Sequence, residues 1–140
     1  MKRAVGALAV ASILVLAVPS PAYAVVAAAG PGSYAAGYVT RVVVVPVGGP
    51  LTFVNGDVVT HTLTADDAYL PRKVARKTAR CSSYSLRRCP LFDSGSVGTG
   101  DAEEIEGLNR LKGGRQYAFY CQIHPSMTGI LVAAGAGDTP

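Results

Sequence analysis

The feature that most constrains this chain is residues 121–127, which read Cys-Gln-Ile-His-Pro-Ser-Met. They follow directly on residues 117–120, Tyr-Ala-Phe-Tyr, whose aromatic composition predicts a strand. Cys121, His124 and Met127 recur at every third position, so their side chains fall on one tight loop at the end of that strand. A thiolate, an imidazole and a thioether are the donors of an electron-transfer copper site, provided that a second imidazole comes from elsewhere.

The chain has one other histidine, His61, within residues 58–65. These residues alternate around His61 and Leu63, which predicts a strand, and they follow an Asn-Gly-Asp turn at residues 55–57. Both histidines are therefore used by a single site, and an enzyme with an additional copper centre in the same chain is excluded. In isolation, His61 would be interpreted as a half-buried strand residue and Met127 as a core residue.

These two segments resemble the cupredoxins, the small blue copper proteins, and especially the plastocyanin, amicyanin and pseudoazurin group. The first is similar to the family's strand, Asn-x-Asp turn and first histidine. The second is similar to its Tyr-x-Phe-Tyr-Cys-x-x-His-Pro-x-Met-x-Gly pattern, matched through Gly129. Residues 92–95, Phe-Asp-Ser-Gly, resemble a motif of bacterial members, and the two-residue gap between His124 and Met127 resembles amicyanin and pseudoazurin. The resemblance covers most of residues 39–132.

The resemblance implies one type 1 copper ion with a weak axial ligand and three strong ones: Met127 in the axial position, and His61, Cys121 and His124. It implies that Asn55 ties the two ligand loops together. Thr62 stands where plastocyanin-like members often have asparagine. We expect its backbone N–H to reach the thiolate of Cys121 and its hydroxyl to replace part of the missing side-chain linkage.

The chain has three cysteines. If Cys121 is a metal ligand, Cys81 and Cys89 are free to form a disulfide in an oxidising compartment. A disulfide from Cys121 to one of the other two, with a spare thiol, is the alternative.

The N-terminus predicts export. Residues 1–24 combine a short basic start, an apolar run and Ala-Tyr-Ala before position 25, which is typical of a signal peptide cleaved after Ala24. A retained membrane anchor is the alternative, but the apolar run is shorter than the ~20 residues of a spanning helix. We expect a mature chain without a transmembrane segment, either periplasmic or extracellular. We also expect it to be a monomer with a flexible lead-in at 25–37, one domain at 38–134 and a disordered tail at 135–140.

Many short β-branched strands with Gly/Pro turns, and no amphipathic helix, predict an all-β sandwich. The resemblance makes it a Greek-key sandwich of the cupredoxin type. Residues 69–91 interrupt the family pattern as an insertion that contains the two remaining cysteines. It has no acidic residue but holds seven of the 13 Lys and Arg residues of the chain.

The insertion is interpreted as a basic loop or short helix that steers an acidic redox partner. A merely solvated surface loop is the alternative. The residues expected to contact that partner are Arg72, Lys73, Arg76, Lys77, Tyr120 and Pro125. Export and the lack of interleaved aromatic and basic residues argue against nucleic-acid binding.

The function that these features predict is non-enzymatic electron transfer by a secreted protein with one type 1 copper. Copper delivery or storage is the main alternative. It would favour open, methionine-rich ligation, and this chain has only Met1 and Met127. A structural zinc site is a further alternative, because cysteine and histidine also bind zinc.

Overall fold

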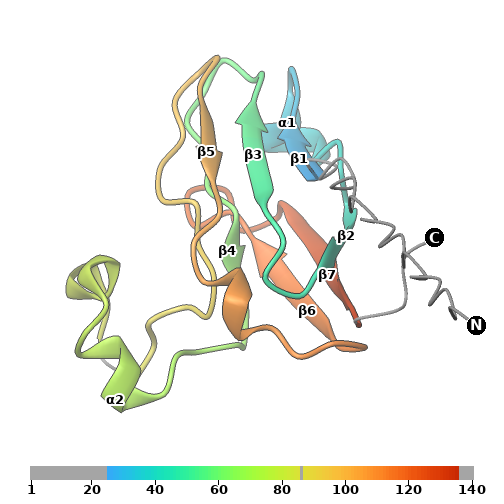
Figure 1. The fold of residues 1–140 in the computed structure, drawn as a ribbon. Coiled ribbons are helices and arrows are strands. Elements are labelled where there is room, and N and C mark those ends of the chain that lie inside the picture. Colours follow the sequence, from blue (N-terminus) through green and yellow to red (C-terminus); the bar gives the residue numbers. More distant parts are fainter. Residues whose placement is uncertain (1–24, 86, 136–140) are drawn as a thin grey trace, which may run out of the picture.

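The computed structural model describes residues 25–135 with the exception of Leu86. They form two sheets that face each other (Figure 1). One sheet has the order β1-β3-β5, with the strands Val25–Ala29, Leu51–Asn55 and Ala102–Glu104. The other has the order β2-β7-β6-β4, with the strands Val42–Pro46, Thr128–Ala134, Gln116–Tyr120 and Thr64–Ala65. The predicted β-sandwich is confirmed.

The core lies between the sheets because the inward positions of the strands are apolar. In β2, for example, Val43 and Val45 are buried while Val42 and Val44 are exposed, as strand alternation requires. Gly129 in β7 has no room for a side chain. A Cβ atom there would collide with the ring of Phe119 on the paired strand. This close approach explains the glycine at the end of the sequence pattern.

Helices are short and lie outside the sheets. They comprise α1 (Ser33–Ala36), α2 (Arg72–Ala75) and two 3-10 turns, η1 (Ala79–Ser83) and η2 (Leu108–Arg110). None of the helices within the described residues has the length and apolar character needed to cross a membrane.

The prediction that residues 25–37 form a flexible lead-in is wrong. β1 pairs in parallel with β3, from Val25 opposite Leu51 to Ala29 opposite Asn55, and α1 follows it directly. Ala27 and Ala29 are buried, so this segment belongs to the core. The predicted signal peptide lies outside the described residues, as does the predicted tail beyond Gly135.

The strand expected at residues 58–65 is much shorter than its pattern suggested. Only Thr64 and Ala65 pair as β4, and His61 forms an isolated bridge with Val97. All five residues from 61 to 65 are buried, so this segment has no solvated face. The alternation of apolar and polar residues therefore does not report one exposed face, because buried polar side chains in this segment are hydrogen-bonded inside the molecule.

The insertion is folded and attached to the sandwich. Its two ends pair at a neck, where the amide of Leu70 donates to Cys89 and the amide of Leu91 donates to Ala68. Cys81 and Cys89 form the predicted disulfide, with both residues buried. Figure 1 shows the insertion as a lobe with α2 at its lower end, projecting beside β4.

Candidate metal centre

Three side chains from two distant segments converge at one end of the sandwich. His61 precedes β4, whereas Cys121 and His124 lie in the loop between β6 and β7. The Sγ atom of Cys121 lies 3.7 Å from Nδ1 of His61 and 3.9 Å from Nδ1 of His124. The two Nδ1 atoms are 3.2 Å apart. In the described part of the chain, this is the one group of three such side chains whose donor atoms meet closely enough for a metal ion.

The spacing of these donor atoms fits a small metal ion. Nitrogen at about 2.0–2.1 Å and sulfur at about 2.3 Å from a first-row ion lie about 3–4 Å from each other in a trigonal or tetrahedral arrangement. The observed separations of 3.2–3.9 Å are in that range. Two imidazoles and one thiolate with a nearby thioether favour copper over zinc.

The loop of Cys121 is closed by its own backbone. The amide of Cys121 donates to the carbonyl of Met127, and the amide of Met127 donates to the carbonyl of His124. Cys121 and Met127 are both fully buried. Met127 therefore does not belong to the exposed surface beside His124. Its thioether lies inside the molecule, in the loop that also carries Cys121 and His124.

A carboxylate that the sequence did not reveal holds His61 in place. Nε2 of His61 lies 2.9 Å from Oδ2 of Asp57, and both side chains are fully buried. Asp57 also accepts hydrogen bonds from the amides of Gly32, Tyr34 and Val58. The hydrogen bond from His61 and these backbone N–H groups hold the pKa of Asp57 well below its usual range, although burial opposes the shift.

The contact with Asp57 determines which nitrogen of His61 is available. Because the carboxylate is ionised, Nε2 carries the proton that it donates, and Nδ1 presents its lone pair toward Cys121. The interpretation of residues 55–57 as a plain turn concealed this role. A carboxylate four residues before a predicted metal-binding histidine was the signal available in the sequence.

Asn55 supports the site differently from the expectation. Its side-chain amide donates to the carbonyls of Val59 and Val97, and its oxygen accepts from the amide of Asp57. Its hydrogen bonds therefore fix the segment that leads to His61, and among the described residues none of them reaches the Cys121 loop.

Thr62 is the residue that joins the two ligand segments. Its backbone N–H donates to Sγ of Cys121 at 3.4 Å, and its hydroxyl accepts from the amide of Gln122 at 2.9 Å. Both contacts agree with the expectation for threonine at this position. The carbonyl of Thr62 accepts from the phenol of Tyr38, whose pKa is raised far above its usual value by burial and then by the nearby Cys121.

The site approaches the surface at His124, which is half-buried. Tyr34 lies beside it, with ring centroids 6.4 Å apart, and Ile123 and Pro125 are exposed. Tyr120 is half-buried, and burial is the main cause of its raised pKa. An apolar rim next to His124 consists of Tyr34, Ile123 and Pro125, and we call it the histidine rim.

Solved structures show the same architecture. A purple cupredoxin from Nitrosopumilus maritimus aligns with a TM-score of 0.53 and 23% identity, over 78% of this chain and 98% of that chain. Amicyanin from Paracoccus versutus aligns with a TM-score of 0.52 and 20% identity, over 82% of this chain and 85% of amicyanin. Auracyanin from Roseiflexus castenholzii aligns with a TM-score of 0.53 and 17% identity, over 79% of this chain and 96% of auracyanin.

No protein-family model matches the chain, and no curated protein sequence matches it. At identities this low the structural likeness establishes the fold, while the site rests on the side chains of this chain. The converging imidazoles and thiolate occupy one end of the sandwich, with the methionine buried in the same loop. The chain therefore has the cupredoxin fold, and His61, Cys121, His124 and Met127 supply the donor set of a type 1 copper site.

Proposed function

We propose that this protein is an exported, non-enzymatic blue copper protein that carries single electrons between redox proteins. The observation that carries the proposal is the convergence of the donor atoms of His61, Cys121 and His124 within 4.8 Å of one another, beside a loop that the backbone of Met127 closes. Bound copper would supply reversible one-electron chemistry between Cu(II) and Cu(I).

The surrounding residues favour electron transfer because they hold the donor atoms fixed. Asp57 orients His61, Thr62 donates to the sulfur of Cys121, and backbone hydrogen bonds close the ligand loop. A site that keeps one geometry in both oxidation states needs little rearrangement when an electron arrives or leaves. Copper delivery or storage is less well supported, since His61, Cys121 and Met127 are fully buried and would exchange an ion slowly.

Export is part of the proposal, to a periplasm or to the outside of the cell. The disulfide between Cys81 and Cys89 supports it, because disulfides persist in oxidising compartments. The partner is a redox protein that contacts the histidine rim or the basic insertion. The sequence assigned Tyr120 and Pro125 to that contact, together with four cations of the insertion: Arg72, Lys73, Arg76 and Lys77.

The visible absorption spectrum after addition of Cu(II), and then of ascorbate, tests this function. We expect an intense thiolate-to-copper band that bleaches on reduction and returns on oxidation. The variant Cys121→Ser should lose the band completely, while replacement of both Cys81 and Cys89 by alanine should keep it. Bound copper without the band would contradict a type 1 site, and rapid loss of copper to a chelator would favour delivery.

A further inference from the structure

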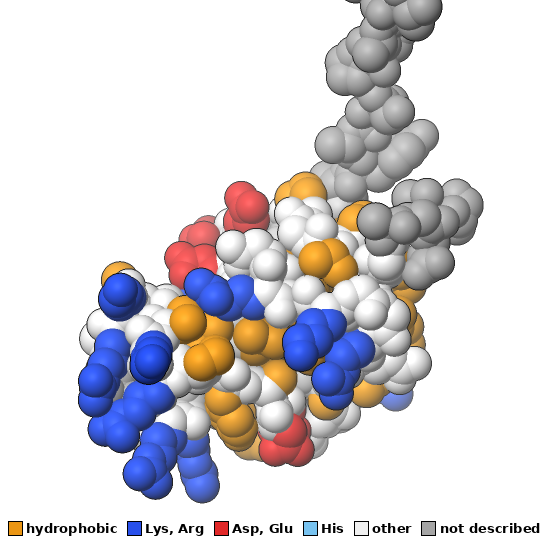
Figure 2. All heavy atoms as spheres, turned by 60° about the horizontal axis from the view of Figure 1, so that its bottom comes forward, with side chains coloured by type: hydrophobic (Ala, Val, Ile, Leu, Met, Phe, Trp, Pro, Cys, Tyr) orange, Lys and Arg blue, Asp and Glu red, His pale blue; other side chains and the backbone are white. Residues whose placement is uncertain are grey.

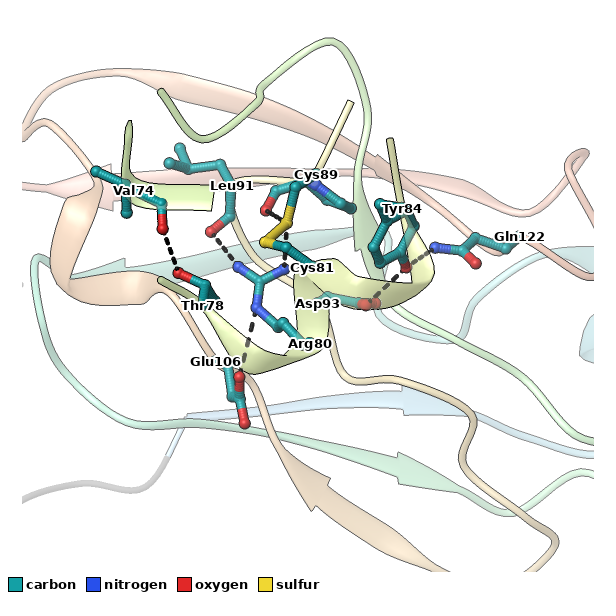
Figure 3. The surroundings of a disulfide bond; sticks show 11 residues. Val74, Thr78, Arg80, Cys81, Tyr84, Cys89, Leu91, Asp93, Glu106 and Gln122 are labelled. Atoms are coloured by element: carbon teal, nitrogen blue, oxygen red, sulfur yellow. Dashed lines mark hydrogen bonds and ion pairs between the residues drawn. A yellow bond between two sulfur atoms is a disulfide. The ribbon is translucent and has the colours of Figure 1, made fainter. Parts of the chain in front are cut away.

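The insertion offers a charged surface whose position relative to the sandwich is fixed. Its core consists of Leu70, Ala75 and the Cys81–Cys89 disulfide, all buried. Arg80 connects the insertion to the rest of the molecule. Its guanidinium donates to the carbonyl of Leu91 at 3.0 Å and pairs with Glu106 at 3.4 Å (Figure 3). The backbone that carries the exposed side chains of the insertion therefore keeps its place beside the sandwich.

Six cations of the insertion are exposed and gather at one edge of the molecule (Figure 2): Arg72, Lys73, Arg76, Lys77, Arg87 and Arg88. In the part of the chain that the structure describes, none of them has a carboxylate within ion-pair distance, in contrast to Arg80. Their charge is therefore available to a partner. The histidine rim differs, because Tyr34, Ile123 and Pro125 carry no charge.

A hydrogen-bonded contact joins this basic lobe to the ligand loop. The phenol of Tyr84 accepts a hydrogen bond from the side-chain amide of Gln122 and donates one to Asp93 (Figure 3). The Gln122 amide also donates to the hydroxyl of Thr64. Gln122 is covalently bonded to Cys121. The path from the partly exposed ring of Tyr84 to the backbone of this metal ligand therefore consists of one hydrogen bond and the covalent bonds of the Gln122 side chain.

We propose that the basic insertion and Tyr84 form a docking surface for an acidic redox protein, which exchanges electrons through Tyr84, Gln122 and Cys121. This inference rests on the proposed electron-carrier function and assigns a path that does not pass through His124, where the site approaches the surface. The occupant must be acidic because unpaired cations in a fixed array raise the association rate of anionic partners. One electron leaves the partner, which is oxidised, and enters the Cys121 site, which is reduced; no proton or heavy atom moves.

Charge removal at matched positions tests the docking surface. A plant-type ferredoxin, an acidic and strongly reducing protein, serves as the probe, and reduction of the copper protein is followed by the bleaching of its blue band. The test variant is Arg72→Gln/Lys73→Gln/Arg76→Gln. The control is Arg110→Gln/Lys112→Gln/Arg115→Gln, which removes the same charge from exposed residues near the start of β6, at the opposite end from Cys121.

At low ionic strength we expect the insertion variant to react about tenfold more slowly and the control less than about twofold more slowly. The difference should vanish at high salt, where charge attraction is screened. Equal effects of the two variants would overturn the docking surface, because net charge alone would then explain the rates.

The route is tested with Tyr84→Phe, which keeps the ring and removes both hydrogen bonds. At saturating ferredoxin we expect electron transfer to slow several-fold. Oxidation by tris(phenanthroline)cobalt(III), a cation with apolar ligands suited to the histidine rim, should be unchanged. An unchanged ferredoxin rate would refute the route. A protein without a blue band would instead refute the proposed function itself, so the two failures are distinguishable.

Discussion

The metal end of the sandwich and the basic insertion are stabilised in opposite ways. At the metal end, buried polar residues such as Asn55, Asp57 and Thr64 bond to one another or to the backbone. In the insertion, charge lies on the outside of a small apolar core closed by a disulfide. Removal of one side chain at the metal end should therefore destabilise its neighbours as well, because their polar groups lose hydrogen-bond partners. Removal of one side chain in the insertion should have only a local effect.

The largest stability effect is expected at Asn55. Replacement by alanine leaves the carbonyl of Val59 and the buried amide of Asp57 without the partners that they have in the native structure. We expect the free energy of unfolding to fall by about 3 kcal/mol, since each unsatisfied group costs about 1–3 kcal/mol. Urea denaturation of the copper-free protein measures it.

Asn109→Ala is the matched control, because Asn109 is exposed and should change stability by less than about 0.5 kcal/mol. If Asn55→Ala is as mild as Asn109→Ala, the metal end is not the interdependent network described above.

The ligand end was predictable because metal chemistry dictates the identity and spacing of the residues. Cysteine, two histidines and methionine have few substitutes as copper ligands, so His61, Cys121, His124 and Met127 were recognisable from sequence. Thr62 was also interpreted correctly, since its contact with Cys121 depends on a backbone N–H that any residue at that position carries.

Features that depend on long-range pairing were not predictable. β1 is an Ala- and Val-rich segment in which apolar and polar residues do not alternate. It becomes a strand because it pairs with β3, whose residues lie 26 positions later in the sequence. The spacing of four residues could have indicated the contact of Asp57 with His61, but its bonds to the distant amides of Gly32 and Tyr34 exist only in the folded chain. Tyr84 and Gln122 are 38 residues apart in the sequence, so no local pattern predicts their contact.

The disulfide tests the local character of the insertion. Replacement of both Cys81 and Cys89 by alanine should lower the free energy of unfolding by about 2–3 kcal/mol, the loop-closure entropy of a bridge across eight positions. Amides at the neck, such as those of Leu70 and Leu91, should exchange hydrogen faster, while the amide of Cys121 stays protected.

The control for this variant is Ser82→Ala/Ser85→Ala, which alters two exposed residues of the same loop. The position of the blue band should be the same in both variants and in the wild type. A shifted band in the cysteine variant alone would show that the insertion helps to set the ligand geometry, and the contrast between the two regions would fail.

The smallest expected effect lies at Tyr84, where the two regions touch. Burial raises the pKa of Tyr84 to about 12, whereas a phenol in the unfolded chain has a pKa of about 10. The fold thus favours the neutral phenol. Its contribution to stability is complete below about pH 10 and is lost as the pH rises from about 10 through about 12.

The alkaline titration of tyrosinate absorbance should therefore show one phenol fewer near pH 12 in Tyr84→Phe than in the wild type. The stability of the wild type should also fall more steeply than that of the variant above about pH 10. If the missing phenol instead ionises near pH 10, Tyr84 is not held between Asp93 and Gln122 in solution. The insertion would then be an independent lobe, and docking there would have no bonded path to Cys121.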